Sequence, residues 1–423
     1  MSYLESRRGR GRDDYPVRPM WNAVIAGIVF QHPTGESLRR ELRRNGELRQ
    51  ACGFDIFSGE AAVPTKDALS RFLALIMECE EQLSCMFHEL VGLLKSELPD
   101  LGKFTAVDSK AIPSFGKPVA DEEKQTEDDR RRDVDADWGV KQYKGTRKDG
   151  TIWEKVTKWF GYKLHLLVDS HYELPLAFEV TGASTNDSPK LMPLVEDIET
   201  NHPEIYRDTV ELSADKGYDS AKNNSVLYDI HNIKPVIDNR KMWKDDELKT
   251  LFDDKYDVFC HDESGQVYCQ CPSDAKEEDY VTELAFIGFE KDRQTLKFKC
   301  PAAHYDYVCP GREECEKLAP LGVGNGGRIV RVPLNIDRRI FTPIARISAN
   351  WKTAYNRRTA VERVNGRLDQ VMGFENHTIR GKQKMTMRMS LALIVMLAMA
   401  LGRIRIGQHD QMRSLVAPIA RVA

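Results

Sequence analysis

The sequence predicts a mixed α/β protein with an all-helical N-terminal domain and a small β-rich insertion, and three observations support this fold class. The first 100 residues show only helical patterns. β-rich runs and helices then alternate, which is typical of a mixed sheet covered by helices. Short β-like runs with six cysteines follow before the last helices. We therefore expect four segments, at residues 1–100, 101–239, 240–339 and 340–423.

The N-terminal segment has the periodicity of short amphipathic helices. "MWNAVIAGIVF" and "ESLRRELRRNGELRQACG" predict two of them, and residues 63–94 predict a longer one. Thr65 is placed to cap the longer helix, and Asp67 lies in its first turn, where a carboxylate is stabilising. Arginines on the second helix fit a DNA-binding or dimerisation module of the helix-turn-helix kind, and a plain helical bundle fits the same pattern.

The middle of the chain contains the runs that predict the sheet. Two of them form a hairpin with a polar turn, and later strands alternate with a helix, so antiparallel and parallel pairing are both expected. The expected elements are strands at 103–112, 158–170 and 173–182, a helix at 188–200, and strands at 209–215 and 233–239.

The formal net charge is only −3, but the charges are segregated along the chain. Residues 1–50 contain 10 Lys and Arg against 6 Asp and Glu, and residues 328–413 contain 17 against 5. Acidic residues gather at 121–137, which predicts a mobile solvated loop, and at 244–279. Basic ends around acidic middle segments suit a protein that holds a polyanion along part of its surface.

No segment predicts a secretory or membrane role. The N-terminus lacks the apolar run of a signal sequence, and the most apolar run, Leu391–Gly402, is shorter than the roughly 20 residues that span a bilayer. That run predicts a buried core helix within a helical C-terminal part, Asn350–Ile406, which is interrupted near Gly373. We expect a cytoplasmic protein whose nine cysteines are reduced.

Two aspartates close β-rich runs of the predicted sheet. Asp108 ends "FTAVD" and Asp215 ends "TVELSAD". Such an aspartate usually caps a turn or helix, and Lys216 and Gly217 after Asp215 favour that reading for it taken alone. Two such strands together also place carboxylates at the rim of an α/β sheet, where ligands bind.

A single acid, Glu362, lies among arginines in "YNRRTAVERVNGRL". Helical spacing puts Tyr355, Arg358, Glu362 and Asp369 on a stripe beside an apolar one. The helix can therefore pack on the sheet and direct Glu362 toward its rim. The apolar stripe consists of Ala354, Val361, Val364, Leu368 and Val371.

Three carboxylates at one rim, Asp108, Asp215 and Glu362, repel one another unless a cation lies between them. Oxygen ligands suit Mg²⁺ or Mn²⁺. Two such ions can hold the attacking and leaving oxygens of a phosphoryl transfer. Arg358 is then placed to meet a phosphate, and Tyr355 to position the backbone of DNA.

Three blocks of the chain, "AVDSKAI", "LSADKGYDS" and "YNRRTAVERVNGRL", resemble the catalytic blocks of DDE transposases of bacterial insertion sequences. The most similar branch has a helical N-terminal domain and a last block that reads Tyr-x2-Arg-x3-Glu, the spacing of Tyr355, Arg358 and Glu362 here. The resemblance implies a ribonuclease H-like catalytic domain, with Asp108, Asp215 and Glu362 as catalytic residues and metal ligands.

The resemblance also implies an activity and partners. Water cleaves the transposon ends, and the exposed 3′-hydroxyl then attacks target DNA, so the partners are double-stranded element ends and target. A homodimer on DNA, at the bacterial nucleoid, is expected. The family often has a lysine where this chain has Asp369, so Arg367 or a residue elsewhere supplies that charge; Tyr355, Arg358 and Arg367 are the expected DNA contacts.

Two other functions are compatible with the same blocks. One is a catalytically inactive or domesticated DNA-binding protein derived from a transposase, and the other is a metal-dependent nuclease that cuts without joining. The intact acidic set disfavours the inactive protein, because DNA binding needs no clustered acids that repel phosphates.

The cysteines of the insertion allow two interpretations. Their number in a reduced protein suggests a structural Zn²⁺, although the Cys-x2-Cys pair of common zinc sites is missing. The alternative is a set of partly buried free thiols. The residues concerned are Cys260, Cys269, Cys271, Cys300, Cys309 and Cys315.

Overall fold

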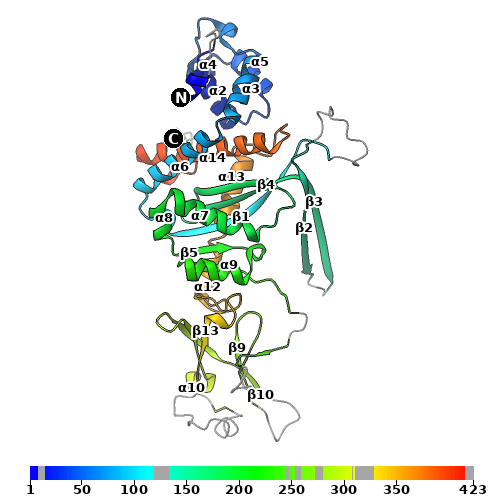
Figure 1. The fold of residues 1–423 in the computed structure, drawn as a ribbon, viewed down its shortest axis with the longest axis vertical. Coiled ribbons are helices and arrows are strands. Elements are labelled where there is room, and N and C mark those ends of the chain that lie inside the picture. The colour runs from blue at the N-terminus through cyan, green and yellow to red at the C-terminus, as the bar shows by residue number, and fades with distance from the viewer. Residues whose placement is uncertain are drawn as a thin grey trace, which may run out of the picture. The chain divides into compact units, whose positions relative to one another are not determined.

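The structure, a computed structural model, describes residues 1–7, 15–118, 133–147, 149, 151–243, 247–252, 259–271, 280–306, 308–309 and 328–414. The chain, drawn as a ribbon in Figure 1, divides into two compact units. The first comprises Met1–Lys103, Asp108–Asp208 and Thr359–Ala423, and the second comprises Phe104–Val107 and Thr209–Arg358. Strand β1 (Phe104–Pro113) therefore has residues in both units.

The first unit begins with helices, as the sequence predicts. Thr65 caps α5 by accepting a hydrogen bond from the Ala68 N–H. The predicted long helix is two helices, however, because the backbone of Cys79 is not helical and Glu80 and Glu81 begin a new first turn. The helices are α1 (Ser2–Arg7), α2 (Val17–Val29), α3 (Gly35–Arg44), α4 (Gly46–Cys52), α5 (Lys66–Met77) and α6 (Glu80–Glu97).

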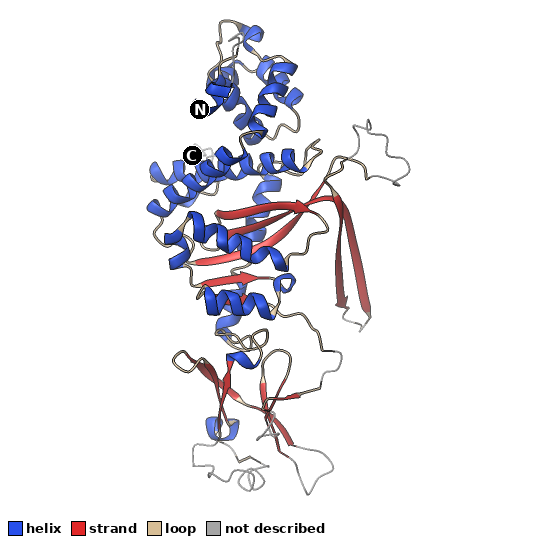
Figure 2. Cartoon of the chain, in the orientation of Figure 1, coloured by secondary structure: helices blue, strands red, loops and turns tan. Residues whose placement is uncertain are grey.

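The predicted mixed sheet is confirmed, with the strand order β2-β3-β1-β5-β6 and with β4 paired to β3. β3 pairs antiparallel with β2 and β4, whereas β5 pairs parallel with β1 and β6 (Figure 2). The predicted hairpin is β3–β4. The strands are β2 (Asp137–Thr146), β3 (Ile152–Asp169), β4 (Pro175–Gly182), β5 (Glu211–Ala214) and β6 (Lys234–Ile237).

The sequence does not predict β2 or the first part of β3. The predicted acidic loop lies outside the described residues at 119–132, but its last residue, Asp137, begins β2. β2 pairs along its length with Ile152–Gly161. This pairing escapes a search for one buried face, because Ile152–Lys158 are exposed on both faces of the ribbon.

Helix α14 (Lys382–Arg405) is the core helix that the apolar run predicts. It packs against β4, α2 and α6, and Leu391–Leu397 are buried. Within the described ranges, α14 alone is long and apolar enough to cross a membrane, but 72% of its most apolar window is buried, as in a core helix. The other helices are α7 (Leu191–Asn201), α8 (Pro203–Asp208), α9 (Ala221–Ser225), α12 (Ala349–Asn356) and α13 (Thr359–Gln370).

Residues 240–339 contain two small sheets, of order β10-β9-β8-β7 and β11-β12-β13. Their inner side chains, among them Phe259, Val267 and Phe298, share one hydrophobic core. The β-rich character of this segment agrees with the sequence. Its elements are β7 (Lys249–Thr250), β8 (Phe259–His261), β9 (Val267–Cys271), β10 (Tyr280–Glu283), β11 (Ala285–Glu290), β12 (Thr295–Lys299), α10 (Pro301–Tyr305) and β13 (Ile329–Pro333).

Candidate active site

Asp108 lies within β1 and not at its end. The expectation that Asp108 ends its strand is wrong, since β1 continues to Pro113, close to the end of the predicted run at 103–112. What ends before Asp108 is the parallel pairing with β5, whose last pair is Val107 with Ala214. Asp108 is half-buried, and its Oδ1 accepts a 2.8 Å hydrogen bond from the Ser109 N–H. The pairing of β1 thus changes at this aspartate.

Asp215 follows β5 directly and caps the turn after it. Its Oδ1 accepts a 2.7 Å hydrogen bond from the Gly217 N–H, in a 3-10 turn at Lys216–Tyr218. The capping reading is therefore correct. It does not exclude a ligand role, because a carboxylate held through one oxygen directs its second oxygen in a defined direction.

A further aspartate, Asp238, was not among the predicted residues. It follows β6, whose parallel pairing with β5 ends at Ile237 opposite Ala214. In each of the three parallel strands, the last paired residue is followed directly by an aspartate. The sequences at these three points are "AVD", "SAD" and "VID". This repeated ending is the signal that could have identified Asp238 in the sequence.

Tyr355 and Arg358 lie at the end of α12, in the second unit. The rings of Trp351 and Tyr355 stack with centroids 4.6 Å apart, and the Arg358 guanidinium lies 5.6 Å from the Tyr355 ring. Burial raises the pKa of Tyr355, and the charges of Asp238 and Asp215 raise that pKa further. The stack of two rings and a cation therefore lies near the aspartates after β5 and β6. Helical spacing did not identify Trp351 as a member of it.

Glu362 lies in the first turn of α13, in the first unit, and is exposed. The continuous helix that the sequence predicts is wrong, because α12 ends at Asn356 and α13 starts at Thr359. The predicted apolar stripe is largely correct, since it supplies the buried side of α13, although Val371 is only half-buried. The buried residues of α13 are Ala360, Val361, Val364 and Leu368.

Lys110 connects β1 to the helix that carries Glu362. Its Nζ lies 2.7 Å from an Asp369 carboxylate oxygen and 2.7 Å from one of Glu375. Lys110 is two residues after Asp108, on the same face of β1. Asp369 is seven residues after Glu362, on the same face of α13. The Lys110–Asp369 pair therefore joins the strand that carries Asp108 to the helix that carries Glu362.

The arginines of α13 converge on a buried acid, Glu173, in the β3–β4 turn. Glu173 is 7% exposed and has a left-handed backbone, with φ of 56°. Arg363, Arg367 and Arg413 approach its carboxylate to 2.5, 3.9 and 3.1 Å. Arg367 also donates to the Glu173 carbonyl oxygen, and burial lowers the pKa of Arg367 to about 10. The expected DNA contact of Arg367 stays a prediction, but here its guanidinium is held inside the protein.

The oxygen donors of Asp108, Asp215 and Glu362 suit a hard cation such as Mg²⁺ or Mn²⁺. Asp108 and Asp215 are each oriented by a backbone N–H, as ligating carboxylates commonly are. Across the described part of the chain, no group of three or more His, Cys, Asp or Glu is close enough together to hold a metal ion. A shared metal site is therefore a proposal that rests on chemistry and strand register.

The cysteines of the insertion do not all fit one zinc ion. Cys260 pairs with Tyr268, and Phe259 pairs with Cys269, in an antiparallel register. Paired residues point to the same face and successive residues alternate, so Cys260 and Cys269 point to opposite faces. No single ion can take both. The Cys271 side chain and all of Cys315 lie outside the described residues.

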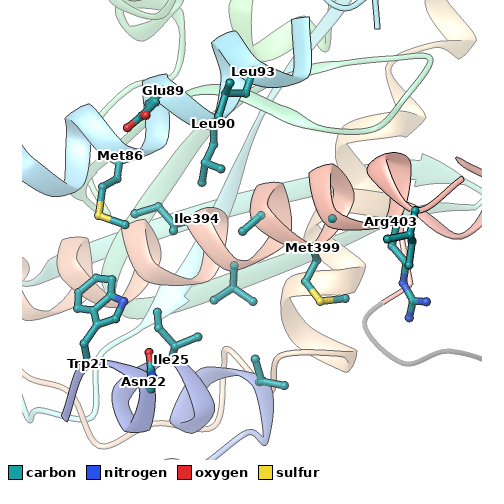
Figure 3. Close-up of a pocket in the computed structure, with 15 residues that line it drawn as sticks. Trp21, Asn22, Ile25, Met86, Glu89, Leu90, Leu93, Ile394, Met399 and Arg403 are labelled. Carbon is teal, nitrogen blue, oxygen red and sulfur yellow. The ribbon is translucent and has the colours of Figure 1, made fainter. Parts of the chain in front are cut away.

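An apolar cavity of about 790 Å³ lies elsewhere in the first unit, among α2, α6 and α14 (Figure 3). Trp21 and Ile25 of α2, Leu90 of α6 and Met399 of α14 line it, and none of the predicted site residues does. Its lining is mostly apolar, and the arginine in it, Arg403, is accompanied by the acid Glu89, so it is not a candidate for the polyanion site.

Comparisons with known proteins agree with the motifs. The family model described as "Transposase DDE domain" matches residues 100–398. A putative transposase for insertion sequence element IS402 from Burkholderia cepacia is 38% identical over 86 residues, 19% of this chain and 39% of that protein. The match thus spans well under half of that relative. No solved structure matches the chain.

Proposed function

This chain belongs to the transposase DDE domain family, and from that membership we propose that it cuts the ends of an insertion sequence and joins them to target DNA. Water attacks the phosphorus at an element end and leaves a 3′-hydroxyl. That hydroxyl then attacks a phosphorus of the target strand, and the target's own 3′ oxygen leaves. The two steps use the same chemistry with different nucleophiles.

The observation that carries the proposal is the shared ending of the β1 and β5 pairing. Val107 and Ala214 are the last partners, and Asp108 and Asp215 come next in their strands. The Lys110–Asp369 pair supports Glu362 as the third member, since it joins the two faces concerned. A β1 flanked by an antiparallel hairpin and by two parallel strands also supports a ribonuclease H-like domain.

We assign the metal to the three carboxylates. Asp108, Asp215 and Glu362 would hold two Mg²⁺ or Mn²⁺ ions, which supply the charge that activates water and stabilises the leaving oxygen. The chain's own groups orient the reactants: backbone N–H groups direct the two aspartates, and α13 presents Glu362. Tyr355 and Arg358 meet the DNA backbone, with Arg358 on a phosphate.

The proposed partners are double-stranded element ends and target DNA, met in the cytoplasm at the nucleoid. The N-terminal helices contribute to DNA binding or to dimerisation. A homodimer on DNA provides one active site for each of the two element ends.

The experiment is to incubate the protein with DNA that flanks its own gene and with Mg²⁺, and to separate the products on a gel. Cut ends together with joined products are expected. Cut ends without joining would indicate a nuclease, and bound but uncut DNA would indicate an inactive DNA-binding protein. The Asp108→Asn protein serves as the negative control.

A further inference from the structure

Residues 140–146 and 152–158 form a two-stranded ribbon, called the arm below, that extends β2 and β3 away from the buried part of the sheet (Figure 1). The pairing is continuous from Val140 opposite Lys158 to Thr146 opposite Ile152. At about 3.3 Å per residue, the arm is roughly 20 Å long. β3 is exposed from Ile152 to Lys158 and mostly buried from Trp159 onward.

The arm exposes large apolar side chains. Ile152 is 80% exposed, and Val140 and Val156 are about half exposed. By the strand register, these three side chains lie on the same face of the ribbon. An isolated two-stranded ribbon is only marginally stable, and an exposed apolar patch usually marks a binding surface. Both arguments indicate that the arm has a partner.

The charge of the arm identifies the class of partner. Residues 140–158 contain six Lys and Arg against two Asp and Glu, in a chain whose net charge is −3. Lys155 and Lys158 are exposed on β3, and Arg147 is exposed at the tip. Lysines along a strand also oppose the addition of a strand from another protein. A polyanion therefore fits better than a second protein chain.

Tryptophans stiffen the ribbon. Trp153 lies over Gly145 and Trp159 over Gly139, so that a Cβ on these glycines would come within 2.7 and 2.2 Å of the respective rings. Each ring thus covers the backbone of the opposite strand. A ribbon that is formed before binding loses less conformational entropy when it binds.

We propose that the arm lies in the major groove of duplex DNA, with the face of Ile152 and Val156 toward the base edges. Lys158 on that face and Lys155 on the opposite face contact phosphates at the two sides of the groove. The major groove, about 12 Å wide, admits a two-stranded ribbon, and thymine methyl groups accept apolar contacts there. The identity of the polyanion rests on the proposed function. The arm itself needs no metal and no cleavage.

Binding can be measured by fluorescence anisotropy without Mg²⁺, with one duplex from the element end and one of unrelated sequence. Lys155→Ala/Lys158→Ala should make the negative slope of log K against log salt shallower by about two. The reason is that each phosphate contact contributes about 0.9 to its magnitude. The control Lys103→Ala/Lys222→Ala makes the same charge change outside the arm and should leave the slope unchanged. Thermal melting should show that both proteins fold.

The apolar face has its own test. Ile152→Ser/Val156→Ser should reduce the preference for the end duplex over the unrelated one and leave the slope unchanged. If the lysine variant loses affinity only for the end duplex, the arm holds element ends; equal loss on both duplexes shows that it also holds target DNA.

Two results would overturn the proposal. One is an unchanged salt slope in the lysine variant. The other is a dimer, measured by sedimentation, that becomes a monomer in Ile152→Ser/Val156→Ser while DNA binding stays intact, because the partner would then be a second chain. Absence of cleavage by the wild type would contradict the proposed function and leave this binding result intact.

Discussion

Helix α13 presents two ionic faces, one acidic and one basic, which differ in the residues that they contact. One face carries Glu362 and Asp369, and Asp369 binds a lysine on the strand of Asp108. The other carries Arg363 and Arg367, which turn onto the buried Glu173. A third, apolar side packs into the core and holds both in place. The comparison teaches that the charge of a residue does not reveal its role: arginines in a basic motif can be structural, while a lone acid among them is exposed.

The largest expected effect is on the acidic set. Asp108→Asn, Asp215→Asn or Glu362→Gln should each reduce cleavage by at least about 100-fold. This loss is larger than the loss that typically follows when a residue supporting a metal ligand is mutated. The reason is that an amide would replace a proposed anionic oxygen ligand of the metal. Gel assays in Mg²⁺ measure cleavage, and anisotropy should show DNA binding largely retained. Near-normal cutting by any one of them would remove that residue from the set.

Glu173→Gln should act on stability instead. Without its charge, three arginines lose their common acid, and breaking a buried ion pair costs about 3 kcal/mol, less here because Arg363 and Arg413 are half-exposed. Urea unfolding measures this. Glu179→Gln breaks a more exposed pair, 2.6 Å from Lys190, and should cost well under half as much. Equal costs would mean that the arginine face is an ordinary surface.

Lys110→Met or Asp369→Asn should weaken Mg²⁺-dependent cleavage about 10- to 100-fold, as is typical when support behind a metal ligand is lost. The half-saturating Mg²⁺ concentration should rise, because the Glu362 face is no longer held to β1. Because Lys110 also pairs with Glu375, the double charge reversal Lys110→Glu/Asp369→Lys is made together with Glu375→Gln. It should recover part of the loss, which it would not do if Lys110 contacted DNA phosphate.

A matched control exists for Lys110. Lys95 lies 2.7 Å from Asp208, and its side chain is 11% exposed, against 10% for Lys110. Lys95→Met should cost similar stability and leave the Mg²⁺ dependence unchanged. An equal shift in both variants would reduce the Lys110 pair to a purely structural contact.

The smallest effect is expected at Arg358. Arg358→Ala should reduce the magnitude of the salt slope of DNA binding by about one, as the loss of one phosphate contact does. Its neighbour offers the contrast: Arg357 pairs with Glu211 and lies 3.8 Å from the Phe104 ring centre, so Arg357→Ala should lower stability and not the slope. If Arg357→Ala instead reduced the salt slope and Arg358→Ala lowered only the stability, the roles of these two arginines would be exchanged.

Local patterns predicted what depends on local interactions. The cap at Thr65, the hairpin β3–β4 and the buried side of α13 follow from periodicity and turn chemistry over a few residues. The break between α12 and α13 was missed because the apolar spacing stays in phase across it. The arm was missed because a ribbon that is exposed on both faces has no apolar period to detect.

The candidate site was predictable in its residue types and not in their partners. The sequence proposed Asp215 and Glu362 from their positions at a strand ending and on a helical stripe, and their role as site residues stays a prediction. It could not show that Lys110 binds Asp369, 259 residues away, or that Glu173 lies 190 residues from the arginine it holds. Such pairs depend on how the strands and helices pack, which no window of sequence contains.

The backbone of Glu173 adds a constraint on how this protein can diverge. Its left-handed conformation favours glycine or asparagine and costs another residue about 1 kcal/mol or more. Replacing Glu173 with glycine would remove the backbone strain but leave three arginines without their acidic partner. Keeping the acid retains the strain. No single substitution satisfies both demands. Among related chains, position 173 is therefore expected to change only together with positions 363, 367 and 413, as one inherited unit.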